Sequence, residues 1–354
     1  MTVRVRFAPS PTGSLHLGNA LTAVANRRFA EARGGSFVLR IDDTDPSRTV
    51  EGGEAAILDD LAWLGVEFDE GPVRQSERGS LYAEAGERAL ASGAAERDSE
   101  GAVRLVRDGT TLLRADGTAT YQLATVVDDL ELGITHVIRG NDHRPNLDVQ
   151  QRIARAIGGV LPEVIHHGLV LGEDGKKLSK RHGHSSIAEL RDEGFPPETV
   201  RAYLDELDLP EHDVHLDLAR LRRLAIDAIA AMSDEELAAA AGAPEKIVPM
   251  LRGARSLVEA REYASLVLRP SVAQLPNEAR PTLDRFAELR APAPEWLSAD
   301  ESRAMLRELK AVGGDLRSLR LALTGVATGP ELAAVLSALA RDETLSRVAR
   351  AVAS

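Results

Sequence analysis

The chain has 354 residues, 44% of them hydrophobic, which predicts a packed globular protein of two or three domains. Its formal net charge of −12 gives no overall basic character, so a nucleic-acid partner would have to bind local arginine-rich surfaces against an overall repulsion. The absence of cysteine excludes disulfides, thiolate catalysis and cysteine-based zinc sites. With neither an apolar leader nor a long apolar run, we expect a cytoplasmic protein without membrane contact.

The first half of the chain alternates strand and helix patterns. Strands are predicted at residues 3–8, 36–41, 120–127, 134–139 and 166–171, and helices at residues 19–33, 54–64, 81–91 and 146–156. This alternation predicts a parallel sheet covered by helices, an α/β fold whose ligand binds at the carboxyl ends of the strands.

From about residue 186 the pattern is helical to the end, with breaks near Pro210, Pro244 and residues 291–294. Alanine, leucine, glutamate and arginine dominate this half, and no internal repeat stands out. We therefore predict an α/β domain at residues 1–185 and all-α domains at residues 186–270 and 271–354.

The segment APSPTGSLHLGNA, residues 8–20, directly follows the first predicted strand. Its prolines, serines and glycines end the strand in a turn that brings His16 and Gly18 to the amino end of the next helix, where phosphates bind well. His16 could donate a hydrogen bond to a phosphate, and Gly18 could let a flat base approach the backbone. Taken alone, the segment is equally compatible with an ordinary turn that carries a surface histidine.

The segment GKKLSKRHG, residues 175–183, holds three of the five lysines of the chain, although the chain has 43 basic residues. A preference for arginine would scatter the remaining lysines, so this cluster indicates a role for a compact, flexible charge, such as contact with phosphate. A lone basic run is more often a solvated loop. Because this segment follows the last predicted strand and the His16 segment follows the first, both can reach one nucleotide.

Further segments resemble the class I aminoacyl-tRNA synthetases and, in detail, the glutamyl-tRNA synthetase family. The matching segments occur in the same order as in the family. Across residues 6–183 they are RFAPSPTGSLHLGNA, GGSFVLRIDDTD, RQSER, ATYQLATVVDD, GITHVIRG and GKKLSKRHG, and a further segment, RLALTG, follows at residues 320–325. The resemblance implies a Rossmann-like class I catalytic domain at residues 1–185, a stem-contact-like helical region at residues 186–270 and a reduced anticodon-binding-like domain at residues 271–354.

The resemblance implies a glutamate–tRNA ligase that acts on ATP, L-glutamate and tRNA, works as a monomer, and receives Mg²⁺ with its ATP. Because the substrate carboxylate itself attacks the α-phosphorus, such an enzyme needs positioned charge rather than a nucleophile. The implied catalytic residues are His16, Gly18, Lys177 and Lys180, and the ATP-binding set adds Ser10, Asn19 and Ser179.

The glutamate site implied by the resemblance consists of Arg6, Ala8, Ser10, Asp42, Tyr121 and Arg139. Arg6 and Arg139 are the expected partners of the substrate side-chain carboxylate and would discriminate against a neutral amide. Asp42 stands where the family usually has a glutamate that holds the substrate ammonium group, and Asn141 replaces a usual glutamate. We expect no protein-bound metal and no zinc, because the histidines match no common zinc spacing.

The chain departs from the family most clearly near residues 92–112, where a connective domain that grips the tRNA acceptor end is reduced to a short stretch. Arginines at positions 220, 222, 223, 252 and 255 could contact RNA phosphates, although a solvated helix face is the more common explanation of any one such cluster. Two alternatives remain: a paralogue that transfers glutamate to another acceptor, and a non-catalytic relative. The RLALTG segment argues against those paralogues that modify a tRNA base, and the intact His16, Gly18, Lys177 and Lys180 argue against a non-catalytic relative.

Overall fold

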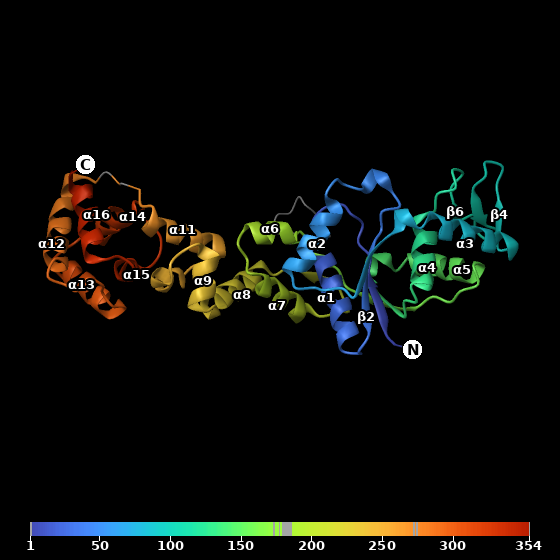
Figure 1. Cartoon of the computed structure of the whole chain (residues 1–354), viewed down its shortest axis with the longest axis horizontal. Helices are drawn as coiled ribbons and strands as arrows, with labels where there is room; N and C mark the ends of the chain where they lie inside the picture. Colours follow the sequence, from blue (N-terminus) through green and yellow to red (C-terminus); the bar gives the residue numbers. More distant parts are fainter. Residues whose placement is uncertain are drawn as a thin grey trace. The chain divides into compact units, whose positions relative to one another are not determined.

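The computed structural model describes residues 2–172, 174–176, 178, 186–271, 273 and 275–353, with the side chain of residue 353 left out. The chain forms two compact units (Figure 1). Unit 1 comprises Met1–Arg191 and Val200–Leu218, and unit 2 comprises Asp192–Thr199 and Ala219–Ser354. Within the described residues, no helix has the length and apolar character needed to cross a membrane.

Unit 1 is built on a five-stranded parallel sheet with the order β3-β2-β1-β7-β8. Its strands are β1 (Arg4–Phe7), β2 (Ser36–Ile41), β3 (Glu70–Arg74), β7 (His136–Gly140) and β8 (Glu163–His167). The strand order reverses between β1 and β7, which leaves a crevice at their carboxyl ends. The sheet and the helical carboxyl-terminal region confirm the predicted fold class.

Helices α1 (Leu17–Glu31), α2 (Gly53–Trp63), α3 (Gly79–Ala91), α4 (Tyr121–Glu131) and α5 (Asn146–Ala156) stand between the strands in the sequence. After the last strand of the sheet come α6 (Ile187–Asp192, whose last residue belongs to unit 2) and α7 (Pro197–Leu207, whose first three residues belong to unit 2). Short 3₁₀ turns stand at Pro46–Arg48, Gln75–Glu77 and Asn141–His143. Asp45 caps the first of these turns, because its carboxylate accepts a hydrogen bond from the Ser47 amide at 3.1 Å.

The prediction of a strand at residues 120–127 was wrong, because this segment begins helix α4. The Thr120 side chain caps the helix by accepting from the Leu123 amide. Every residue from Leu123 to Asp129 is buried, including Thr125 and the two aspartates, so no exposed polar face reveals the helical period. A short buried helix of this kind cannot be told from a buried strand by periodicity alone.

The strand predicted at residues 166–171 is divided between two sheets. β8 ends at His167, and β9 (Val170–Leu171) pairs in parallel with β10 (Val214–His215) in a separate two-stranded sheet. Gly168 lies at the division, and its amide donates to Pro210 O at 2.6 Å. A Cβ at Gly168 would lie 1.9 Å from His212 O, so only glycine permits this close approach of the two backbones.

The reduced insertion near residues 92–112 folds as a three-stranded antiparallel sheet of β4 (Ala95–Arg97), β5 (Val103–Leu105) and β6 (Thr111–Leu113). Its buried side chains belong to the same core cluster as Tyr82, Ala85 and Ala89 of α3. In Figure 1 these strands lie beside α3, α4 and α5. Strands of three residues are too short to show a two-residue period, which explains why the sequence predicts no sheet here.

Unit 2 is helical apart from its connecting loops. Its helices are α8 (Leu218–Ala231, whose first residue belongs to unit 1), α9 (Asp234–Ala241), α10 (Val248–Leu251), α11 (Leu257–Leu268), α12 (Arg280–Arg290), α13 (Ala299–Ala311), α14 (Leu316–Thr324), α15 (Leu332–Ser337) and α16 (Arg341–Ala353), with 3₁₀ turns at Glu245–Ile247 and Asn277–Ala279. One core cluster runs from Ile229 to Ala351.

Several arginines of unit 2 hold helix ends together. Arg252 donates to Met232 O and Ala230 O at the end of α8, and Arg255 forms a pair with Glu259 at 2.9 Å. The buried Arg347 donates to Leu323 O at 2.8 Å and Val267 O at 2.7 Å. Arg252 and Arg255 therefore have structural partners, which weakens the expectation that they contact RNA.

Candidate active site

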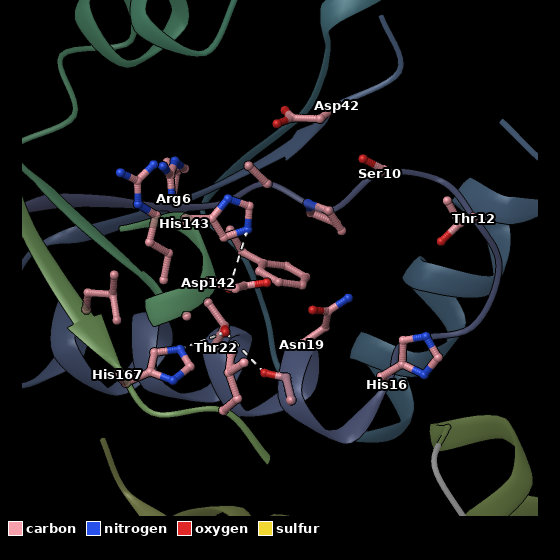
Figure 2. A pocket seen from close by; sticks show the side chains of 18 of the residues that line it. Arg6, Ser10, Thr12, His16, Asn19, Thr22, Asp42, Asp142, His143 and His167 are labelled. Atoms are coloured by element: carbon pink, nitrogen blue, oxygen red, sulfur yellow. Dashed lines mark hydrogen bonds and ion pairs between the residues drawn. The ribbon is translucent and has the colours of Figure 1, made fainter. Parts of the chain in front are cut away.

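A cavity of about 500 Å³ opens at the carboxyl ends of β1 and β7, where the strand order reverses. Its size is typical of small-molecule sites. Figure 2 shows Arg6 and Asp42 on the side of the strands, and His16 and Asn19 at the start of α1. The cavity is lined by every described residue of the predicted site, namely Arg6, Ala8, Ser10, His16, Gly18, Asn19, Asp42, Tyr121 and Arg139.

Helix α1 presents its amino end to this cavity. His16 occupies the N-cap position with extended backbone angles, and its side chain makes no capping hydrogen bond. A Cβ at Gly18 would have no protein atom within 4 Å, so protein packing does not require glycine here. The open space beside Gly18 belongs to the cavity, and the amino end of the helix favours a negatively charged ligand there.

The loop that leads into α1 is fixed by a buried carboxylate. Asp60 of α2 accepts from the Ser14 hydroxyl and from the Leu15 amide, both at 2.7 Å. The Ser14 hydroxyl oxygen also accepts from the Ala188 amide of α6 at 3.1 Å, and Arg191 lies 3.5 Å from Asp60. Asp60 thus connects the loop before α1 to the segment that follows the lysine-rich loop.

The lysine-rich loop itself lies largely outside the described residues, and Lys177, Ser179 and Lys180 are among those left out. Leu178 is described, is 5% exposed and lines the cavity. Ser186 pairs with His16 in an isolated antiparallel bridge. Leu178 of the loop therefore lies at the cavity, and Ser186, which follows the loop, lies beside the histidine of the cavity.

Arg139 supplies a buried donor that has no partner. Its Nη1 donates to Gln150 Oε1 at 3.0 Å and its Nε to His166 Nε2 at 3.4 Å, whereas Nη2 is buried and has no hydrogen-bond partner among the described residues. Burial, and then the nearby Arg6, lower the pKa of Arg139. A buried donor that faces such repulsion is well suited to bind an anion.

Arg6 belongs to a buried ion-pair network. Its Nε donates to Asp129 Oδ1 at 3.1 Å and its Nη2 to Asp129 Oδ2 at 3.4 Å, and Arg40 also donates to Asp129 at 2.8 Å. Burial acts to raise the pKa of Asp129, but Arg6 and Arg40 outweigh it and hold that pKa below its usual value. The charge of Arg6 is therefore partly compensated, in contrast to that of Arg139.

Asp42 projects from the end of β2 and is paired with Arg40 at 2.6 Å and 3.2 Å. Its side chain is 6% exposed, and burial raises its pKa, an effect that Arg40 only partly offsets. Tyr121, at the first residue of α4, also lines the cavity, and burial followed by the charge of Asp42 raises the pKa of its phenol. Tyr121 is therefore neutral at physiological pH.

Asn141 has a structural partner that explains its presence. Its amide donates to Asp213 Oδ1 at 2.8 Å, and the same oxygen accepts from the Leu169 amide at 2.8 Å. A glutamate at position 141 would place a second negative charge against Asp213. The Asn141–Asp213 contact joins the end of β7 to the segment before β10.

The histidines near the cavity have separate environments. Burial, and then Arg139, lower the pKa of His166 to about 4, so His166 is neutral and accepts from Arg139. Burial lowers the pKa of His167, which contacts Thr22 Oγ1 at 2.9 Å and Gly168 O at 2.8 Å. Within the described part of the chain, no group of three or more histidine, aspartate or glutamate side chains is arranged to hold a metal ion.

Sequence reasoning missed Arg40, which lines the cavity, and two carboxylates that do not line it, Asp128 and Asp129. Arg40 and the pair Asp128 and Asp129 stood in the quoted segments, and two adjacent carboxylates after an apolar run are an available signal for buried ion pairing. Further cavity residues that were not predicted include Thr12, Thr22, Arg48, Asp142, His143 and His167.

Comparisons with known proteins show which family the chain belongs to. The family model described as tRNA synthetases class I (E and Q), catalytic domain, matches residues 2–107 and 99–216, and a model of an anticodon binding domain matches residues 275–352. Glutamate–tRNA ligase 1 of Rubrobacter xylanophilus is 38% identical over 423 aligned positions, which cover 99% of this chain and 98% of the relative. This alignment is longer than the chain, so the relative has positions that this chain lacks.

Glutamate–tRNA ligase 1 of Acidiphilium cryptum is 34% identical over 98% of this chain and 99% of its own length. The crystal structure of a glutamate tRNA ligase from Elizabethkingia meningosepticum in complex with its amino acid is 23% identical and matches with a TM-score of 0.80 over the whole of both chains. That likeness shows the fold. On the family model and the full-length relatives, the chain belongs to the class I tRNA synthetases (E and Q).

Proposed function

We propose that the protein is a glutamate–tRNA ligase, which activates L-glutamate with ATP and transfers it to the 3′ end of a glutamate tRNA. The observation that carries this proposal is the buried Nη2 of Arg139, a donor on a cation that Arg6 repels, for which the described part of the chain offers no acceptor. A substrate carboxylate on Arg139 would satisfy that donor and compensate the charge. A glutamine amide can satisfy the donor through its oxygen but leaves the charge uncompensated.

The two ends of glutamate bind to opposite charges in this proposal. Arg139, with Arg6 beside it, binds the side-chain carboxylate, and Asp42 binds the ammonium group, with Tyr121, Ser10 and Ala8 lining the space between. This arrangement leaves the α-carboxylate free to attack the α-phosphorus of ATP. The site therefore contributes orientation, which converts a reaction between two substrates into one within a single complex.

ATP binds beside Gly18 at the amino end of α1 in this proposal. Ser10, His16 and Asn19 lie at the same end of the cavity and offer hydrogen-bonding groups, and Lys177, Ser179 and Lys180 act on the phosphates. The attacking carboxylate and the departing pyrophosphate both carry negative charge, so positive charge positioned here stabilises the transition state. Mg²⁺ arrives with ATP, bound to the phosphate oxygens.

We infer that tRNA is the acceptor, because the anticodon binding domain model matches residues 275–352. This match favours the ligase over a relative that transfers glutamate elsewhere. The exposed Arg220, Arg222 and Arg223 of α8 are candidate phosphate contacts, although Arg223 also lies 3.7 Å from Asp227. We propose that the enzyme acts as a monomer in the cytoplasm, where it meets its tRNA.

The proposal is tested by amino-acid-dependent exchange of pyrophosphate into ATP, run with and without total tRNA. Glutamate should support exchange, whereas glutamine and aspartate at equal concentration should support little. Comparable exchange with either of them would overturn the proposed substrate. The acceptor is tested separately by the salt dependence of tRNA charging, which should be steeper than that of exchange because phosphate contacts release counterions.

A further inference from the structure

Arg40 of β2 is completely buried, and its guanidinium contacts three carboxylates. Its Nε and Nη2 donate to the two oxygens of Asp42, its Nη1 donates to Asp129 at 2.8 Å, and Asp128 lies at 3.8 Å. A planar fork with donors on several edges can serve these partners together, which a lysine ammonium cannot do with the same geometry.

Arg40 lines the substrate cavity, and its contacts position two further charged groups of the lining. Asp42 lines the cavity directly. Asp129 does not line it but holds Arg6, which does, through two hydrogen bonds. One buried side chain therefore sets the position of a carboxylate on the cavity wall and, through Asp129, of a guanidinium on the same wall.

The charges explain why Asp42 can still attract a cation although it is paired. The charge of Arg40 is divided among three carboxylates, and Arg78 adds a separate contact to Asp128 at 2.7 Å. The groups that face Asp42 are Arg40 from β2, Arg6 from β1, and Tyr121 and Asp129 from α4. Burial raises the pKa of Asp42, and Arg40 is the strongest influence that opposes this rise.

We propose that Arg40 is a positioning residue for the amino-acid substrate: it holds Asp42 ionised and directed at the substrate ammonium group, and through Asp129 it fixes Arg6. This inference rests on the proposed function. It also accounts for an aspartate at this position, because the bidentate contact with Arg40 fixes the direction of the short side chain.

The decisive variant is Arg40→Lys in the full chain, assayed by glutamate-dependent pyrophosphate exchange with total tRNA present. The positive charge remains in this variant, but the planar guanidinium and its several donors are lost. The glutamate KM should therefore rise by roughly 10- to 100-fold, which is the effect expected when a hydrogen bond to a charged group is lost. The ATP KM should change less than about twofold. The matched control is Arg78→Lys, which changes an arginine on the same acidic pair outside the cavity lining. Its glutamate KM should stay near that of the wild type.

The pH profile gives a readout that a purely structural role would not change. In Arg40→Met the opposing charge is gone, so the pKa of Asp42 rises further and the acidic limb of kcat/KM for glutamate moves to higher pH. A glutamate KM for Arg40→Lys within twofold of the wild type, an equal rise in Arg78→Lys, or an unmoved acidic limb would each overturn the inference.

Thermal unfolding shows whether Arg40→Lys is folded. If it is not, Asp129→Asn carries the same test, because this nearly isosteric change leaves Arg40 and Asp42 in place while it weakens the hold on Arg6. It should raise the glutamate KM, and an unchanged KM would overturn the inference. Wild-type protein that shows no glutamate-dependent exchange would instead overturn the proposed function, so the two failures are distinguishable.

Discussion

Replacement of Arg139 by methionine should separate stability from activity. In the protein without substrate, Arg139 makes one good hydrogen bond, to Gln150, and one long contact, to His166, while Nη2 has no partner among the residues that the structure describes. One hydrogen bond contributes about 0.5–1.5 kcal/mol to the free energy of unfolding, and removal of a repelled buried charge offsets this loss. We therefore expect Arg139→Met to change the free energy of unfolding by less than about 1 kcal/mol.

Activity should respond very differently. Truncation of one partner in a buried, hydrogen-bonded charge pair costs about 2–5 kcal/mol, so kcat/KM for glutamate should fall by roughly 30- to 5,000-fold. The preference for glutamate over glutamine should shrink as well, because the uncompensated charge that rejects the amide is gone. Pyrophosphate exchange measures both effects, and urea unfolding measures stability.

The control for this pair of measurements is Arg347→Met in unit 2. Arg347 is buried and donates to Leu323 O and Val267 O, so its loss leaves carbonyls unpaired and should lower the free energy of unfolding by about 1–3 kcal/mol without a change in glutamate KM. Our reasoning is refuted if Arg139→Met keeps kcat/KM for glutamate within about threefold of the wild type, or loses activity only because it unfolds.

Three further predictions concern other parts of unit 1. Lys180→Ala should slow adenylate formation by about 100- to 1,000-fold with a much smaller effect on glutamate KM, and near-normal exchange would show that the lysine cluster is ordinary surface. Asp60→Ala should raise the ATP KM and lower the urea midpoint, because Ser14 and the Leu15 amide lose their hydrogen-bond acceptor. Asp59 is exposed, so Asp59→Ala should change neither quantity, and equal behaviour of the two variants would contradict this prediction. The urea midpoint should fall as pH drops from 7.5 to 5.5. The pKa values of His166 and His167 are lowered in the folded protein, so as the pH falls these histidines are protonated in the unfolded chain before they are protonated in the folded one. His167→Asn should make the urea midpoint depend less steeply on pH, and an unchanged slope would refute this prediction.

The cavity itself follows from patterns that a sequence displays. A strand followed by a proline- and glycine-rich turn and a helix places His16 and Gly18 at a helix amino end, and this placement is confirmed. Positions such as these are predictable because local chain geometry decides where they lie. Arg139, by contrast, was implied by the family resemblance; it is the next-to-last residue of β7 and lines the cavity.

The ion pairs behind the cavity do not follow from local geometry. Asp129 meets Arg6 and Arg40 across 123 and 89 residues of sequence, and only the packing of α4 against the sheet brings them together. The same helix was predicted as a strand, because burial around most of its surface hides the helical period. Because α4 was predicted as a strand, the sequence did not reveal that Asp129 pairs with Arg6. Arg6 and Arg139 were therefore assigned the same role, although only Arg6 has this carboxylate partner.

The central claim is that this chain transfers glutamate to tRNA. It is tested most directly by incubating the full chain with radiolabelled glutamate, ATP, Mg²⁺ and total tRNA at low salt and measuring the radioactivity that acid precipitates with the tRNA. We predict ATP-dependent labelling of tRNA that periodate oxidation of the tRNA 3′ end abolishes, since oxidation removes the accepting hydroxyl. Active exchange without any labelled tRNA, or labelling that survives periodate, would contradict the account and assign the activated glutamate to a different acceptor.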